Sequence, residues 1–414
     1  MSKPTGVQTL IRPAHEDRLL AVLRERGAMS RADLAQALGL SRTTLSEITS
    51  SLLARGALSI VDTDASVRAG SGRPAERLAL DPASSQYLGV DFGHRRVQIV
   101  IADAAHEIIA SGSHHYSDID GWDTRLACAF ELIEREAAGS GIHFGALQGI
   151  AIGVPGPYTT VPLVSLREGW GNHEPSRGID KAFKERFGAP AIVDNNTRFA
   201  ALAEALGTAS EAVQDLIYVR LSDGVGGGLV IGGRLIGGSA GLAGELGHVT
   251  AVPEGDRCRC GKLGCLETVA SVTAILAICR ARGARLDSLE DLRAAVDRGH
   301  PTVDAVLHEA GAAVGRVLGS AAMTLNPSIV VIGGEITQAA PVLVEYARRS
   351  LRYELSSVAE AMPVLRAAEL TDMAGALGGV ATLLNRSSLL ADYGTAVHAK
   401  ASIRTTIQTI RSIS

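Results

Sequence analysis

Three segments near the N-terminus carry hydrophobic residues at helical spacing, separated by polar residues and glycine. The first segment covers residues 15–26, and Ser30 and Ser41 are in position to cap the second and third. Gly56 ends the third segment, and the sequence ALSIVD after it predicts a strand. Helix, helix, tight glycine turn, helix and strand is the order of a winged helix-turn-helix. We therefore predict such a DNA-binding domain over residues 1–82, with its wing and a linker at the end.

The third of these helices has a polar face opposite its hydrophobic stripe. Side chains on that face can offer donors, acceptors and a methyl group to base edges in the major groove. The glycine-rich segment RAGSGRP further on can place an arginine in a minor groove. The alternative is a three-helix packing unit whose polar face is simply solvated. The residues predicted to contact DNA are Arg42, Thr43, Thr44, Ser46, Glu47 and Arg73.

The rest of the chain alternates buried-strand patterns with amphipathic helical segments, in two successive cycles. Each cycle begins with a strand meander and continues with crossover helices, which predicts an α/β fold of two similar lobes around a cleft. We expect the first lobe over residues 87–205 and the second over 206–371. A segment from about 372 to 395 returns to the first lobe, and residues 396–414 form a polar tail that we assign to no structure.

Composition supports an α/β protein and narrows its setting. At 414 residues the chain is too long for one ordinary core, and 46% of its residues are hydrophobic but only 4% aromatic. No apolar run approaches the roughly 20 residues that cross a bilayer, and the N-terminus lacks an apolar signal core, so we expect a cytoplasmic protein without membrane insertion. Five cysteines disfavour a disulfide framework.

Charge is distributed unevenly along the chain. Residues 1–82 contain 11 Lys and Arg against 9 Asp and Glu, a net charge of +2, and the remainder contains 29 against 35, a net charge of −6. A slightly basic N-terminal part on an acidic body predicts different partners for the two parts.

Glycine-rich turns follow three of the predicted strands, in DFGHRR, SDGVGGG and IGGEI. Such turns let backbone N–H groups approach phosphate, although close packing of backbone also requires glycine. Together with the two lobes, these turns predict a cleft that binds a nucleotide or a sugar.

Three of the five cysteines lie in the segment CRCGKLGCLE, and a histidine stands ten residues upstream of the first. Thiolates and imidazole are the ligands of closed, tetrahedral zinc sites. We predict one structural Zn²⁺ held by His248, Cys258, Cys260 and Cys265. The alternative is a loop packed by reduced cysteines.

These motifs resemble those of the ROK family (repressors, open reading frames and kinases), which has the two-lobed actin/hexokinase-like fold. The resemblance is carried by GVPG, DNN, GVGGGLVIGGRLIGG, GELGHV and CRCGKLGCLE, and it covers nearly the whole chain. With its N-terminal domain, the chain is similar to the regulator branch, such as xylose, glucose and N-acetylglucosamine repressors. The resemblance implies the same four zinc ligands, with the second ring nitrogen of the histidine facing the ligand. It also implies sugar contacts from Asn195, Asn196, Glu245, His248 and Glu267.

The chain departs from ROK kinases at two places. A kinase has an aspartate as general base where this chain has Asn196, and loss of a general base removes a factor on the order of 10²–10⁴ in rate. In the first phosphate turn, kinases resemble D-x-G-G-T, whereas His94 and Arg95 stand here after Asp91 and Gly93. We therefore predict that kinase chemistry is lost, and that sugar binding either survives with altered specificity or is vestigial.

The sequence predicts a DNA-binding transcriptional repressor of carbohydrate genes that is controlled by a sugar or sugar derivative in a catalytically inactive cleft. An ATP-dependent sugar kinase, or a regulator controlled by a protein partner, are the alternatives. The expected partners are double-stranded operator DNA and the effector. Closing the lobes would shift the angle between the N-terminal domains of a homodimer, or of a dimer of dimers, and so change its fit to two half-sites.

Overall fold

The structure is a computed structural model. It describes residues 15–386 except for 17, 21, 24–25, 55–56, 64–75, 82–84, 105, 140–141, 143, 157, 159–177, 208–212, 357–361 and 371–372. Two predictions lie outside the described residues: the minor-groove role of Arg73, with the glycine-rich tip around it, and the assignment of residues 396–414.

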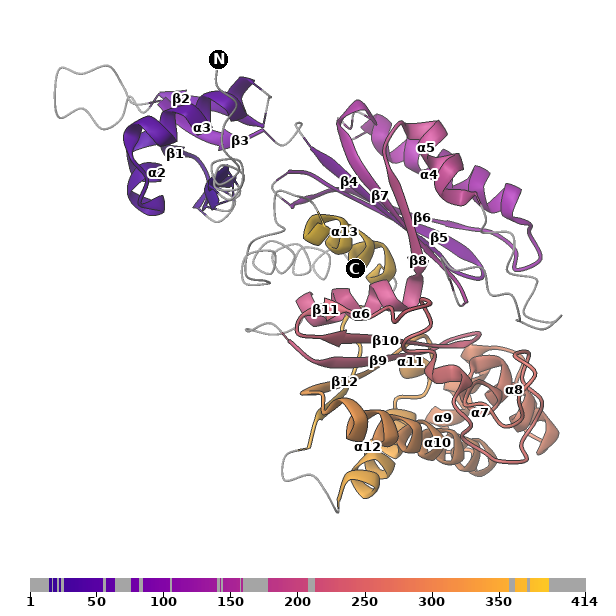
Figure 1. The fold of residues 1–414 in the computed structure, drawn as a ribbon. Coiled ribbons are helices and arrows are strands. Elements are labelled where there is room, and N and C mark those ends of the chain that lie inside the picture. Colours follow the sequence, from indigo (N-terminus) through magenta and orange to yellow (C-terminus); the bar gives the residue numbers. More distant parts are fainter. Residues whose placement is uncertain are drawn as a thin grey trace.

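The N-terminal unit packs helices against a small antiparallel sheet (Figure 1). The oxygen Oγ of Ser30 accepts a hydrogen bond from the backbone N–H of Asp33 at 3.2 Å, which confirms the predicted cap. Leu34 and Leu45 of the helices pack with Leu78 of the sheet in one buried core. The elements are β1 (Met29–Ser30), α2 (Arg31–Leu38), α3 (Arg42–Ala54), β2 (Leu58–Thr63) and β3 (Glu76–Leu80), with the strand order β1-β3-β2.

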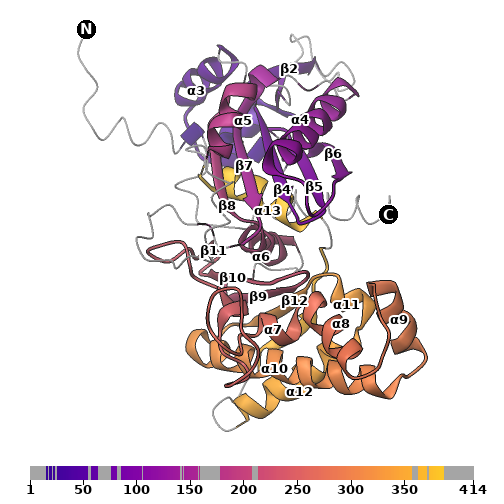
Figure 2. The ribbon, with the colours of Figure 1, turned by 90° about the vertical axis from the view of Figure 1, so that its right-hand side faces the viewer.

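The first lobe is a five-stranded mixed sheet in the order β6-β5-β4-β7-β8. Its central strand is buried at every position because helices cover both faces of the sheet, as the near-continuous hydrophobic run predicts. Figure 2 shows α4 and α5 on one face and α13 on the other. The elements are β4 (Gln86–Phe92), β5 (Arg96–Ala102), β6 (Ile108–His115), α4 (Trp122–Gly139), β7 (Leu147–Val154), α5 (Ile179–Phe187) and β8 (Ala191–Asn195).

The second lobe repeats this plan with the strand order β11-β10-β9-β12-β13. Its outer face is covered by helices, among which α10 and α12 approach closely because glycines replace side chains at their contact. A Cβ at Gly315 would lie 2.5 Å from the carbonyl oxygen of Ala347. The strands are β9 (Leu216–Leu221), β10 (Val225–Ile231), β11 (Arg234–Leu235), β12 (Ile329–Gly333) and β13 (Val364–Ala367). The helices are α7 (Glu267–Ala270), α8 (Val272–Ala281), α9 (Leu289–Asp297), α10 (Pro301–Leu325), α11 (Ile336–Ala339) and α12 (Val342–Leu355).

Two helices, α6 (Asn196–Gly207) and α13 (Ala374–Arg386), lie between the two sheets and pack against each other (Figures 1 and 2). A Cβ at Gly378 of α13 would lie 1.7 Å from the carbonyl oxygen of Phe199 on α6, so only glycine permits this approach. The C-terminal helix also packs on β4 and β7 of the first lobe. The boundary predicted after residue 205 falls inside α6, which contacts α13 on one side and β10 on the other and so belongs to both lobes.

Of the helices in the described ranges, none is both long and apolar enough to cross a membrane. The longest, α10, has 25 residues.

Candidate functional site

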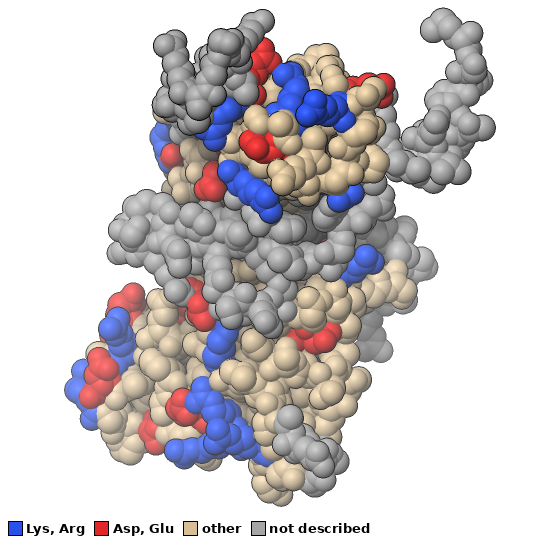
Figure 3. Space-filling model, turned by 90° about the vertical axis from the view of Figure 1, so that its left-hand side faces the viewer, with Lys and Arg blue, Asp and Glu red and all other residues tan. Residues whose placement is uncertain are grey.

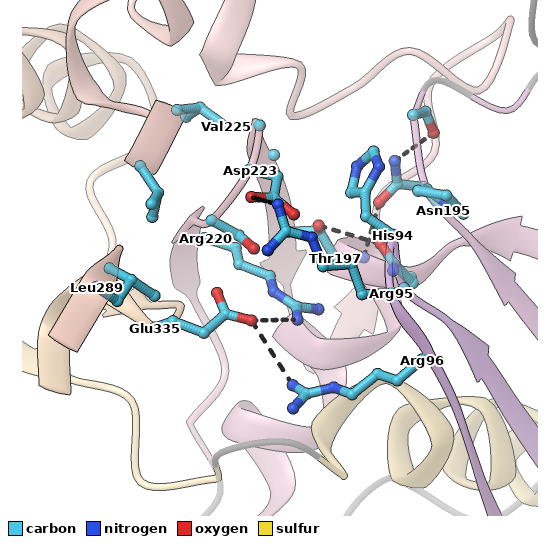
Figure 4. A pocket seen from close by; sticks show the side chains of 18 of the residues that line it. His94, Arg95, Arg96, Asn195, Thr197, Arg220, Asp223, Val225, Leu289 and Glu335 are labelled. Atoms are coloured by element: carbon cyan, nitrogen blue, oxygen red, sulfur yellow. Dashed lines mark hydrogen bonds and ion pairs between the residues drawn. The ribbon is translucent and has the colours of Figure 1, made fainter. Parts of the chain in front are cut away.

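A cavity of about 410 Å³ opens between the two lobes and is lined by residues of both. The first lobe contributes the turn before β5, the end of β7 and the junction of β8 with α6. The second lobe contributes the end of β9, the start of β10, the segment before the cysteine cluster and the start of α9 (Figure 4). Four of the five predicted sugar contacts line this cavity: Asn195, Asn196, Glu245 and His248.

Asn195 is the N-terminal cap of α6. Its Oδ1 accepts hydrogen bonds from the backbone N–H groups of Thr197 at 2.8 Å and Arg198 at 3.3 Å. Its Nδ2 donates to the carbonyl oxygen of Gly156 at 2.5 Å, which ties the cap to the turn after β7. The amide is therefore held in one orientation at the cavity wall.

The side-chain amide of Asn196 is hydrogen-bonded by the protein. Its Nδ2 donates to Oδ1 of Asp91 at 2.9 Å and to the carbonyl oxygen of Phe92 at 3.0 Å. Both amide hydrogens are thus used, and the amide oxygen accepts a long hydrogen bond from the hydroxyl of Thr197 at 3.4 Å, which leaves one of its two lone pairs to accept from a ligand. Burial raises the pKa of Asp91, against the opposing charge of Arg220.

The glycines of the segment SDGVGGG serve packing more than they serve phosphate binding. A Cβ at Gly226 would lie 2.5 Å from Oγ1 of Thr197, and a Cβ at Gly228 would lie 2.6 Å from Cβ of Ala201. The N-terminal half of β10 therefore lies directly on α6. This contact supports the packing alternative for those two glycines, since they face a helix. The turn itself carries the acidic Asp223 at the cavity, which would repel a phosphate.

The four predicted metal ligands converge. Their candidate ligand atoms, one nitrogen and three sulfurs, all lie within 4.8 Å of one another. The Sγ of Cys258 is 3.6 Å from Nδ1 of His248, and the sulfurs of Cys260 and Cys265 are 3.5 Å apart. Bond lengths of about 2.0–2.3 Å put the ligand atoms of a tetrahedral zinc roughly 3.3–3.8 Å apart, a range that contains the separations of 3.6 and 3.5 Å. The four residues could therefore hold one metal ion.

The loop that carries these ligands is shaped by local backbone contacts. Thr250 and Cys265 form an antiparallel bridge, and a second bridge joins Arg257 to Leu263. Gly264 has φ of +64° and would place a Cβ 1.5 Å from the carbonyl oxygen of Val252, so only glycine fits.

Protonation of the cluster is consistent with a metal site. Burial lowers the pKa of His248, which keeps its ring neutral as a metal ligand must be. Burial raises the pKa of Cys258, and it raises the pKa of Cys265 to about 12, so these thiols hold their protons until a cation takes the thiolates. Nδ1 of His248 faces the sulfurs while the ring lines the cavity, as expected for a ligand that connects a metal to a binding wall.

Glu245 is the acidic residue of the E-x-G-H motif. It lies at the cavity just before the short turn Leu246–His248. Burial raises its pKa to about 7, while Arg198 and Arg259 oppose the shift. A Cβ at Gly247 would lie 1.9 Å from the carbonyl oxygen of Val225, so the motif's glycine lets this turn pack against β10.

Glu267 lies directly behind the cavity-lining Gly224 and is not itself among the lining residues, so its sugar contact stays a prediction. Its carboxylate forms an ion pair with Arg259, with Nε to Oε1 at 2.9 Å and Nη2 to Oε2 at 3.1 Å. It also accepts from the backbone N–H of Val225 at 3.1 Å. The carboxylate is therefore engaged within the second lobe, and Arg259 itself lines the cavity.

Sequence reasoning missed the charged residues at the far end of the cavity from the cysteine cluster. Arg96, Arg220 and Glu335 meet there, with both arginines pointing toward one carboxylate (Figure 4). The available signal was a charged residue at the end of a buried strand or directly after a glycine turn, as in IGGEI.

The predicted DNA-contacting face of α3 is on the surface. Arg42, Thr43, Ser46 and Glu47 are exposed, and Thr44 is half-buried. The hydroxyl of Thr44 lies 2.9 Å from that of Ser41 and takes part in the helix cap. Figure 3 shows basic side chains on this N-terminal unit, with acidic ones among them.

Comparison with known proteins places this geometry in a family. The ROK family profile matches residues 87–386. A glucokinase of Halalkalibacterium halodurans is 30% identical over 71% of this chain and 93% of its own length. The transcriptional dual regulator NagC of Escherichia coli is 28% identical over 93% of this chain and 95% of its own length.

Among solved structures, a ROK family transcriptional regulator described as a homologue of the Escherichia coli MLC protein covers 96% of this chain and 99% of its own, with a TM-score of 0.67 and 25% identity. The ROK hexokinase of Thermus thermophilus covers 72% of this chain and 98% of its own, with a TM-score of 0.60 and 29% identity. The family and the two-lobed fold that the motifs predict are thereby confirmed. This chain belongs to the ROK family.

Proposed function

We propose that this protein is a sequence-specific DNA-binding transcription regulator, a repressor of carbohydrate genes, whose cleft binds a sugar or sugar derivative without phosphorylating it. The observation that carries the proposal is a combination on one chain. An N-terminal helical unit with an exposed polar helix face precedes a sugar-kinase-like cleft that has Asn196 where a kinase has its base.

The N-terminal unit supports DNA binding. We assign α3 as the recognition helix of a winged helix-turn-helix, since its hydrophobic side is buried on α2 and the sheet while its polar side is exposed. Arg42, Thr43 and Ser46 lie in its N-terminal half, the part of a recognition helix that contacts base edges. The regulators compared above extend over 93–96% of this chain, whereas the glucokinase and hexokinase cover 71–72%. The additional coverage supports an N-terminal part shared with regulators.

The cavity supports binding of a polyhydroxyl ligand. Asn195, Asn196 and Glu245 offer amide and carboxylate groups, and His248 adds a ring nitrogen. Such convergent polar groups in a concave site are what sugar hydroxyls require. In our assignment a structural Zn²⁺ on the cysteine cluster fixes the ring of His248. Glu267 supports the site indirectly, because its ion pair fixes the side chain of Arg259, which lines the cavity.

A sugar kinase is the second candidate function, favoured by the 30% identity to a glucokinase. Asn196 opposes it because a neutral amide cannot accept the proton of a sugar hydroxyl. Asp223 and Arg95 at the phosphate turns oppose it as well, since they form an ion pair with each other at 3.9 Å. A coupled assay of ADP release with a panel of hexoses separates the two functions, because a kinase turns over and the proposed regulator does not.

The test of DNA binding is a gel shift on the DNA upstream of the protein's own gene. We expect Arg42→Ala to weaken specific binding by roughly 1–3 kcal/mol if the guanidinium reads a base edge. Lys181→Ala is the matched control, because it removes one exposed positive charge from α5 in the body of the protein. Equal binding by the two variants, or binding that does not depend on DNA sequence, would contradict the proposal.

The regulator controlled by a protein partner differs from the proposal in one respect. It binds DNA but gives no heat with any sugar in calorimetry.

A further inference from the structure

Ion pairs cross the cleft between the two lobes. Nη2 of Arg96, at the start of β5 in the first lobe, lies 3.6 Å from Oε1 of Glu335 in the second lobe. Glu335 follows β12 and caps α11, and the same oxygen lies 3.7 Å from Nη2 of Arg220 on β9. Figure 4 shows both guanidinium groups pointing toward this carboxylate from the same side. One carboxylate of the second lobe is thus shared by an arginine from each lobe.

A second pair reinforces the first. Nη2 of Arg95 in the first lobe lies 3.9 Å from Oδ1 of Asp223 in the second lobe, and 3.8 Å from Asp118 of its own lobe. Arg95 is more exposed than Arg96, so this pair contributes less. Opposite charges therefore face each other across the gap at two positions.

The shared carboxylate divides the cleft. The cavity described above continues into another of about 440 Å³, and five residues line both: Arg96, Arg220, Leu289, Glu290 and Glu335. Since Arg96 and Glu335 come from opposite lobes, the wall between the two cavities forms only when the lobes stand close.

The distances indicate a contact that responds to lobe position. Separations of 3.6–3.9 Å are longer than the roughly 2.7–2.9 Å of a charge-assisted hydrogen bond. A small closing movement would shorten both cross-cleft contacts together, and a small opening would break them. Burial alone would raise the pKa of Glu335, but Arg220, a hydrogen bond from Ser222 and Arg96 hold it below its ordinary value. The carboxylate is therefore charged and available for the pair.

We propose that Arg96 and Glu335, assisted by Arg95 and Asp223, form an electrostatic latch that favours the closed arrangement of the two lobes. Its role in regulation rests on the proposed function. A ligand held by Asn196 of α6 and by His248 of the second lobe would close the cleft along the same path as the latch. By linkage, a change that stabilises the cross-cleft ion pairs raises the affinity for the ligand, and ligand binding in turn stabilises these ion pairs.

The latch can be tested without ligand or DNA. A clickable unnatural amino acid at Ile119 in the first lobe and another at Tyr353 in the second accept a dye pair, since these side chains are 88% and 80% exposed. The labelled protein is mixed with excess unlabelled protein so that energy transfer reports distances within one chain. We expect Glu335→Gln and Arg96→Gln each to lower the ratio of closed to open molecules by roughly two- to fivefold, as for a partly exposed ion pair. The double variant should lower it no further, and high salt should reduce the difference from the native protein.

Glu290→Gln is the matched control. Glu290 lines both cavities, but it takes part in none of the ion pairs that the described residues form. If Glu335→Gln behaves like Glu290→Gln, or if the effects of Arg96→Gln and Glu335→Gln add fully, the latch does not exist. If the native protein binds neither specific DNA nor any sugar, the proposed function is contradicted. The energy-transfer result on the latch remains valid in that case. The two failures are therefore distinguishable.

Discussion

At one end of the cleft, four side chains from a single stretch of the second lobe converge within 4.8 Å, and at the other end Arg96 of the first lobe faces Glu335 of the second at 3.6 Å. The first end depends on loop geometry that does not change when the lobes move. The second end depends on where the lobes stand. This difference suggests a division of work, in which the end with the cysteines fixes the ligand-facing ring of His248 and the end with Arg96 and Glu335 senses closure.

Removing one cysteine of the cluster is the change with the largest expected effect, because it alters the end of the cleft whose geometry is fixed by the loop, which we call the fixed end. If the cluster holds the proposed Zn²⁺, the protein should contain one zinc per chain, measured by a colorimetric chelator, and Cys260→Ser should abolish this binding and lower the Tm by roughly 10 °C or more. Cys128→Ser is the control, since Cys128 is far from the cluster in sequence and is not among the residues that could hold an ion. Zinc content and Tm unchanged in Cys260→Ser would show that the cysteines only pack a loop.

Restoring a carboxylate at position 196 tests why the cleft holds an amide. Asn196→Asp would place a negative charge where two hydrogen bonds are now donated, to Asp91 and to the carbonyl oxygen of Phe92. We expect the free energy of unfolding to fall by about 2 kcal/mol, because both buried acceptors lose their donor. We also expect no ADP release with any hexose, since the turn residues Arg95 and Asp223 remain.

Asn326→Asp is the control for stability, because Asn326 is exposed at the end of α10. An Asn196→Asp variant that phosphorylates a hexose would show that the amide alone separates this cleft from a kinase.

How far the sequence predicted these two ends depends on the range of the interactions. The convergence of His248 with the three cysteines was predictable because all four lie within 18 positions. The helices near Ser30 and Ser41 were predictable because caps and hydrophobic spacing are local. The ion pair of Glu267 with Arg259 could not be predicted, since the choice between a ligand contact and an ion pair depends on side-chain packing. The pairing of Arg96 with Glu335 was also missed, because 239 positions separate them and only the folded lobes bring them together.

Glu267→Gln tests whether the ion pair with Arg259 supports ligand binding. Without the carboxylate, Arg259 loses its ion pair, and we expect effector affinity measured by calorimetry to fall about tenfold or more, as when an outer-shell partner of a binding site is removed. Glu254→Gln, at an exposed loop position of the same region, should leave the affinity unchanged. If the two variants bind alike, Glu267 has no part in the site.

The smallest expected effect is a dependence on pH at the fixed end. Burial raises the pKa of Glu245 to about 7, so this carboxyl gains a proton as the pH falls from 8 to 6. A protonated carboxyl accepts sugar hydroxyls less well, and the effector's Kd should rise a few-fold, at most about tenfold per pH unit below the pKa. Glu245→Gln should flatten this profile. A Kd that falls toward low pH would contradict the role given to this carboxylate.

The central claim is that ligand binding in an inactive kinase-like cleft controls DNA binding by the N-terminal domain. The direct measurement is the fluorescence anisotropy of labelled upstream DNA, titrated with the protein at increasing concentrations of each sugar of a panel, with ATP present and ADP monitored. We predict that at least one sugar changes the Kd for the specific DNA by tenfold or more, on the order of 1.4 kcal/mol of coupling, with no ADP formed. A Kd for DNA that no sugar changes, or ADP formed at a sugar-dependent rate, would contradict the account.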